Sequence, residues 1–116
     1  MPRKYSTDVE GKPFNREMID KVWEKGVKIE GVKSSSLRKD KCGVVIAKIH
    51  YGDMVDYGWE IDHIKPVSKG GTDSLSNLQP LFWENNRYKK DDYPDWRCKN
   101  KNKSETNSKI TINFKS

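Results

Sequence analysis

Three polar residues, Asp62, His63 and Asn86, have the clearest chemical potential in the chain. An aspartate carboxylate is a hard oxygen ligand that suits Mg²⁺ or Mn²⁺, and an asparagine adds a neutral amide oxygen. A histidine side chain titrates near neutral pH and can take a proton from water. One carboxylate and one amide leave several positions on a cation open for water and phosphate oxygens. These side chains together suit metal-assisted hydrolysis of a phosphodiester bond.

The elements predicted around these residues run strand, long loop, short strand, helix. They are expected at residues 59–64, 65–77, 78–81 and 82–90. Because adjacent strand residues point to opposite faces, Asp62 and His63 can serve one site only if the strand bends or ends there. Pro66 and the Gly-rich loop that follows it favour such an end.

Outside residues 59–90 the sequence predicts one helix and one strand. Asn15 can cap a helix over 16–25, because apolar residues recur at helical spacing from Met18 to Trp23 and Gly26 follows. The β-branched run at 42–49 predicts a strand. Residues 1–14 and 27–41 predict irregular structure. Alternating apolar residues at 110–114 form an edge strand or no element.

The composition indicates one small, charged domain. The chain has 116 residues, of which 33% are hydrophobic and 34% charged, with a net charge of +6. No apolar run approaches the roughly 18 residues of a membrane span and no signal peptide is visible, so we expect an intracellular protein in cytoplasm or nucleus. Six basic residues and one acidic residue lie in the last twenty positions. We therefore predict one domain over 1–96 and a basic, flexible tail over 97–116, which stays solvated or touches a polyanion.

The two cysteines, Cys42 and Cys98, are too few for a disulfide scaffold or a four-thiolate zinc site. A bridge between them stays open as an alternative. Without an export signal, two free thiols are the expectation.

Residues 59–91 resemble the HNH endonucleases, the ββα-metal group. Three blocks carry the resemblance in order: Asp-His-Ile-x-Pro-x-Ser-x-Gly-Gly-x-Asp, Ser-Asn-Leu-Gln-Pro-Leu and Asn-Arg-x-Lys-x-Asp. The resemblance implies an α+β fold whose core is two short antiparallel strands joined by a long loop, followed by a helix. An N-terminal helix and an additional strand or hairpin would be added to this core.

The resemblance also implies roles for the matched positions. His63 would be the general base, and Asn77 would be the catalytic-loop residue that holds the loop near this histidine. Asp62 and Asn86 would hold one divalent cation, Mg²⁺ or Mn²⁺.

Further roles implied by the resemblance lie around these four positions. Glu84 would assist through a water on the cation. The residues expected at DNA phosphates are Arg87, Lys89 and Lys69. The products would carry 5′-phosphate and 3′-hydroxyl ends.

Two departures from the family pattern are visible. Many relatives hold a structural zinc with two Cys-x-x-Cys pairs, which this chain lacks. We expect no structural zinc here, and we expect apolar packing by Trp59, Phe82 and Trp83 in its place. The last motif position is Asn86 where others carry His, which favours Mg²⁺ or Mn²⁺ over softer metals.

The resulting prediction is a metal-dependent DNA endonuclease with no membrane association. One small domain has little surface for reading bases, so specificity would be low or supplied by a dimer or a protein partner. Two alternatives remain open: a nucleic-acid-binding module that has lost the chemistry, and a nuclease that acts on RNA.

Overall fold

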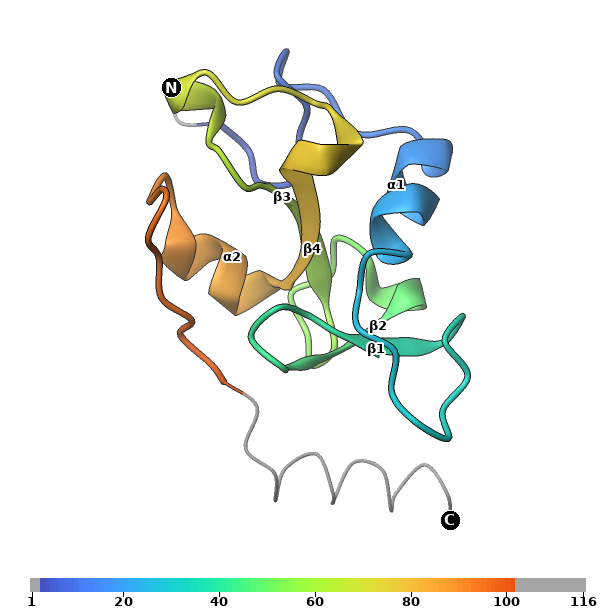
Figure 1. Cartoon of the computed structure of the whole chain (residues 1–116). Coiled ribbons are helices and arrows are strands. Elements are labelled where there is room, and N and C mark those ends of the chain that lie inside the picture. Colours follow the sequence, from blue (N-terminus) through green and yellow to red (C-terminus); the bar gives the residue numbers. More distant parts are fainter. Residues whose placement is uncertain (1–2, 102–116) are drawn as a thin grey trace.

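The computed structural model describes residues 3–101. Within them the fold is α+β, with two α helices and two separate two-stranded antiparallel sheets (Figure 1). No helix in this part of the chain has both the length and the hydrophobicity to cross a membrane. The alternating segment at 110–114 lies outside the described residues.

Helix α1, Arg16–Trp23, begins at the predicted residue and ends two residues before the predicted end. The Asn15 side chain accepts a hydrogen bond from the Met18 amide at 2.8 Å, which satisfies one of the free amides of the first turn. Trp23 is buried, and its ring centroid lies 5.2 Å from that of Trp59. Helix α1 thereby covers one side of the sheet formed by Trp59–His63 and Leu78–Phe82, and helix α2, Trp83–Lys89, lies on the other side (Figure 1).

The first sheet pairs β1, Leu37–Lys39, with β2, Val45–Ala47. The sequence analysis predicted one strand over 42–49 and no strand at 37–39. The observed strand is shorter because the Asp40 carboxylate accepts hydrogen bonds from the Cys42 and Val44 amides, both at 2.9 Å, and so folds these residues into the turn between the strands. A 3₁₀ turn at Lys48–His50 ends the strand on the other side.

The second sheet pairs β3, Trp59–His63, with β4, Leu78–Phe82. Both strands lie within one residue of their predicted bounds. Asp62 faces Gln79 across the sheet. Helix α2, Trp83–Lys89, follows β4 directly. The main apolar core is built around this sheet from Phe14, Val22, Trp23, Ile46, Trp59, Ile61, Leu78 and Phe82, with Trp83 packed against it.

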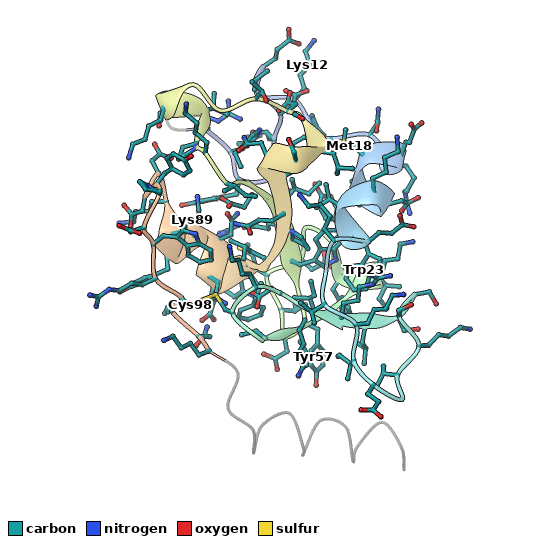
Figure 2. All side chains as sticks on the ribbon, in the orientation of Figure 1. Lys12, Met18, Trp23, Tyr57, Lys89 and Cys98 are labelled. Atoms are coloured by element: carbon teal, nitrogen blue, oxygen red, sulfur yellow. A yellow bond between two sulfur atoms is a disulfide. The ribbon has the colours of Figure 1, made fainter. Side chains whose placement is uncertain are left out.

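The expectation of two free thiols is wrong: Cys42 and Cys98 form a disulfide, with 5.9 Å between their Cα atoms (Figure 2). The predicted boundary at residue 97 must also move, because Asn100 pairs with the side chain of Asn85. The Asn100 amide donates to Asn85 Oδ1 at 2.7 Å, and Asn85 Nδ2 donates back to the Asn100 carbonyl at 3.0 Å. Residues 97–101 therefore belong to the folded unit, and 102–116 lie outside the described residues.

Reducing the disulfide should lower the free energy of unfolding by about 2–4 kcal/mol, because the cross-link restricts the unfolded chain over a long loop. Urea denaturation of the full chain, with and without reductant, measures this effect. A Cys42→Ser/Cys98→Ser variant should show the lower midpoint in both conditions. A wild-type midpoint that does not respond to reductant would contradict the bond.

Candidate active site

Asp62, His63 and Asn86 line one open cleft of about 860 Å³. The first two lie at the end of β3, and Asn86 lies on α2. Neighbouring residues within a strand point to opposite faces. Because β3 ends at His63, Asp62 and His63 can both reach the same cleft. The hairpin and the helix that follows it therefore bring together residues that are distant in the sequence.

Asp62 is buried and has partners on one of its two carboxylate oxygens. Its Oδ2 accepts a hydrogen bond from Gln79 Nε2 at 2.9 Å and lies 3.4 Å from the Lys89 ammonium. Burial raises the pKa of Asp62 to about 6, and the opposing pull of Lys89 and Gln79 does not cancel this effect. Oδ1 accepts no hydrogen bond from the described residues, so it is available to a ligand in the cleft.

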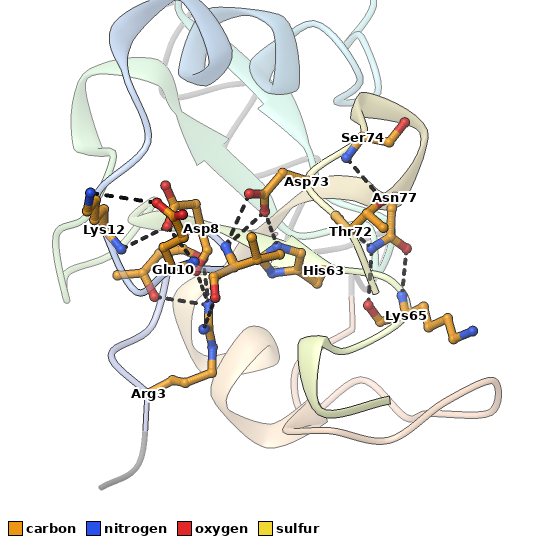
Figure 3. A network of polar contacts seen from close by, with 12 residues as sticks. Arg3, Asp8, Glu10, Lys12, His63, Lys65, Thr72, Asp73, Ser74 and Asn77 are labelled. Carbon is orange, nitrogen blue, oxygen red and sulfur yellow. Dashed lines mark hydrogen bonds and ion pairs between the residues drawn. The ribbon is translucent and has the colours of Figure 1, made fainter. Parts of the chain in front are cut away.

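His63 is held through one ring nitrogen (Figure 3). Its Nε2 donates to Asp73 Oδ1 at 2.8 Å. The Val9 amide in turn donates to both oxygens of Asp73, at 3.1 and 3.2 Å. The Phe14 ring packs against the imidazole, with 6.0 Å between the ring centroids. With Nε2 occupied by a donated bond, Nδ1 carries the lone pair of the neutral ring and has no partner among the described residues.

The loop between the strands is closed by Asn77 and two glycines. The Asn77 amide accepts from the Lys65 N–H at 2.8 Å and donates to the carbonyls of Lys65 and Thr72. Gly70 has φ 91°, and a Cβ on Gly71 would lie 1.7 Å from the Lys65 carbonyl oxygen. The Gly-Gly pair and Asn77 thus fold the loop so that Asp73 returns to His63.

Asn86 is buried and lines the same cleft. Its Nδ2 donates to Glu60 Oε1 at 2.9 Å, and its Oδ1 accepts nothing from residues 3–101. Arg87, the next residue of α2, donates to Glu60 Oε2 at 2.8 Å. This bond to Glu60 raises the pKa of the Arg87 guanidinium above its ordinary value.

Three residues that the sequence assigned to a cation-bound water or to DNA phosphates do not line the cleft: Glu84, Lys89 and Arg87. Glu84 does not line the cleft: it accepts from Asn100 Nδ2 at 2.7 Å and lies 3.8 Å from Lys99. Two residues along a helix is a rotation of about 200°, so Glu84 and Asn86 face different ways. Lys89 is fully buried with no surface for a phosphate, and its ammonium instead donates to the His63 carbonyl at 3.1 Å and pairs with Asp62.

Of the other two residues predicted to contact DNA phosphates, Lys69 lies on the cleft and Arg87 does not. Lys69 is exposed on the cleft, where Arg3, Lys4 and Lys90 also lie. Arg87 does not line the cleft; its guanidinium is committed to Glu60 and lies 4.4 Å from the Tyr5 ring centroid. The four basic side chains on the cleft, called here the basic rim, come from the loop, the N-terminal segment and the end of α2; Asp91 and Asp92 also line the cleft.

The donor set fits a hard divalent cation held by few protein ligands. Within residues 3–101 there is no cluster of three or more His, Cys, Asp or Glu side chains that would enclose a metal. What the cleft offers is one carboxylate oxygen of Asp62 and one amide oxygen of Asn86, both without a hydrogen-bond donor in the described structure. Oxygen donors with open positions suit Mg²⁺ or Mn²⁺, which keep several water ligands.

Residues 41–92 match the family model described as HNH endonuclease. This stretch is similar to the HNH endonuclease family. No curated protein and no solved structure matches the sequence. The matched stretch contains β2, β3, β4 and α2 with the cleft residues they carry, and it connects this protein with nucleic-acid chemistry. Residues 3–40 lie outside the match.

Several residues that support the candidate site were not predicted from the sequence. Asp73 stood in the quoted Gly-Gly-x-Asp pattern without a role, and its contact with His63 needed the closed loop to be seen. Glu60 carries a usable signal, because it lies two residues before Asp62 and so on the same face of the strand. Val9 had no signal, since only its backbone amide takes part.

Proposed function

We propose that this protein is a metal-dependent DNA endonuclease in which β3, β4 and α2 form a ββα-metal core. The observation that carries the proposal is that Asp62, His63 and Asn86 line a single cleft with a basic rim. The HNH family match supports it independently. The reaction is hydrolysis of a phosphodiester bond, leaving 5′-phosphate and 3′-hydroxyl ends.

In the proposed mechanism, His63 Nδ1 takes a proton from the water that attacks phosphorus. The bond from water oxygen to phosphorus forms as the bond from phosphorus to the 3′-oxygen breaks, and the departing 3′-oxygen takes a proton from solvent water to become the 3′-hydroxyl. Asp73, bonded to Nε2, holds the imidazole in place and stabilises the imidazolium that forms. Asp62 and Asn86 would hold one Mg²⁺ or Mn²⁺, and this cation would supply positive charge to stabilise the phosphate and the leaving oxygen.

The basic rim gives the proposal its substrate. Exposed Lys69 and Lys90 lie on the cleft with Arg3 and Lys4 from the N-terminal segment. Such side chains bind phosphates without reading bases, which fits cleavage of low sequence specificity or a partner that supplies specificity.

Removing divalent cations should abolish cleavage. The measurement is conversion of supercoiled plasmid to nicked and linear forms by the full chain with Mg²⁺, with Mn²⁺, and with a chelator. We expect cleavage in the first two and none in the third, and restoration when the cation is added back in excess. Cleavage that survives chelation would refute the mechanism.

The same assay separates the alternative functions. A single-stranded and a structured RNA run beside the plasmid should be cut more slowly than DNA; the reverse order would indicate an RNA nuclease. Plasmid that is bound and retarded but never cut, with either cation, would indicate a binding module without the chemistry.

A further inference from the structure

Glu60 is a buried carboxylate with two partners on α2. It lies on β3 and is 3% exposed. One oxygen accepts from Asn86 Nδ2 at 2.9 Å, and the other accepts from Arg87 Nη2 at 2.8 Å. The guanidinium carbon of Arg87 also lies 4.4 Å from the Tyr5 ring centroid and 5.4 Å from that of Trp83. Glu60 therefore has a defined place and does not line the cleft.

The contact with Asn86 has a chemical consequence. An asparagine side chain is nearly symmetric in shape, but only its carbonyl end can bind a cation, and its amino end repels one. An ionised carboxylate can only accept hydrogen bonds, so Glu60 takes the amino end of Asn86. The opposite end, Oδ1, is then left without a donor from the described residues beside the cleft that Asn86 and Asp62 share.

We propose that Glu60 is a positioning residue that selects the cation-binding orientation of the Asn86 amide. The proposal rests on the proposed function, because the cation is the one that Asp62 and Asn86 would hold there. Glu60 does not itself bind the cation, since both its oxygens are occupied by α2. Outer partners of this kind commonly change metal affinity by about 10- to 100-fold.

Mn²⁺ titration by calorimetry on the full chain tests this, with no substrate present. Glu60→Gln keeps the shape but offers Asn86 either an oxygen or an amino group, so the amide is no longer fixed in one orientation. We expect Mn²⁺ affinity to fall about tenfold or more. The matched control is Glu84→Gln, the same change on a residue that faces Asn100, which should keep wild-type affinity.

A reversed pair sharpens the test. Asn86→Asp alone sets two carboxylates against each other and removes the donor that Glu60 uses, so it should bind Mn²⁺ poorly. Adding Glu60→Gln supplies an amino group that can donate to the new carboxylate, whose other oxygen then faces the cleft. The double variant should bind Mn²⁺ more tightly than either single variant. If the losses of Mn²⁺ binding free energy in the two single variants simply add in the double variant, Glu60 only anchors Arg87 and the proposal is overturned.

The titrations separate failure of this inference from failure of the proposed function. Wild-type protein that binds no Mn²⁺ would overturn the metal site and this inference with it. Wild-type binding with a Glu60→Gln affinity within twofold of it would overturn the role of Glu60 alone. Should Glu60→Gln not fold, nuclear Overhauser contacts in the unaltered protein decide: contacts from the Asn86 amino protons to Glu60 support the proposal, and contacts to His63 instead refute it.

Discussion

Replacing His63 by alanine should lower the rate of DNA cleavage by about 10²–10⁴-fold with the fold intact. The imidazole lies on the cleft with Nε2 bonded to Asp73, and Nδ1 has no partner among residues 3–101, so it can take a proton from water. Its loss leaves Asp73, whose side chain is one-third exposed and still bonded to the Val9 amide, so little stability is expected to be lost. Initial rates on supercoiled plasmid measure the effect.

The matched control is His50→Ala, the other histidine of the chain. His50 pairs with Asp53 at 3.2 Å outside the cleft, and its removal should leave the cleavage rate unchanged. Circular dichroism melting of both variants separates lost chemistry from lost folding. A His63→Ala protein that cuts at the wild-type rate would remove the imidazole from the mechanism.

Replacing Lys89 by methionine should lower the free energy of unfolding by about 3–5 kcal/mol. Lys89 is fully buried, donates to the His63 carbonyl at 3.1 Å and lies 3.4 Å from Asp62. Without the ammonium, the buried Asp62 carboxylate has no counter-charge. The free-energy cost of this unpaired charge is larger than the net stabilisation that the ion pair provides. Urea denaturation in the presence of chelator measures the loss. Lys90→Met, the exposed neighbour, should change stability by no more than about 0.5 kcal/mol.

The loss should depend on pH with a definite sign. Burial already raises the pKa of Asp62 to about 6, and removing Lys89 raises it further, because the ammonium lowers it. A carboxyl whose pKa is raised on folding favours the folded state at low pH and loses that advantage as the pH rises through the folded pKa. The Lys89→Met defect should therefore be smaller at pH 5 than at pH 8. Adding Asp62→Asn should recover most of it; no recovery would show that lost packing, and not charge, causes the defect.

Much of the framework follows from local sequence. The Asn15 cap and the apolar spacing before Gly26 predict a helix, and residues 78–81 predict a short strand. Both elements lie within two residues of those observed. The cleft residues of β3 and α2 were recognisable because their types and spacing are rare together. The helix α2 also begins within one residue of its predicted start.

What the sequence could not supply depends on contacts distant along the chain. Strand β1 has one apolar residue, Leu37, beside two cations, so no alternation indicated it. The burial of Lys89 runs against the usual exposure of lysine and is explained only by its contact with Asp62. The disulfide depends on the approach of residues 56 positions apart.

The bond from the Val9 amide to Asp73 has a practical consequence for protein engineering. A fragment trimmed to residues 41–92 would keep every side chain of the motif and still lose the backbone donor that steadies the partner of His63. It would also lose Tyr5 from the face of Arg87. A fusion that is meant to keep the His63 site therefore needs the N-terminal segment of the chain as well as the motif residues.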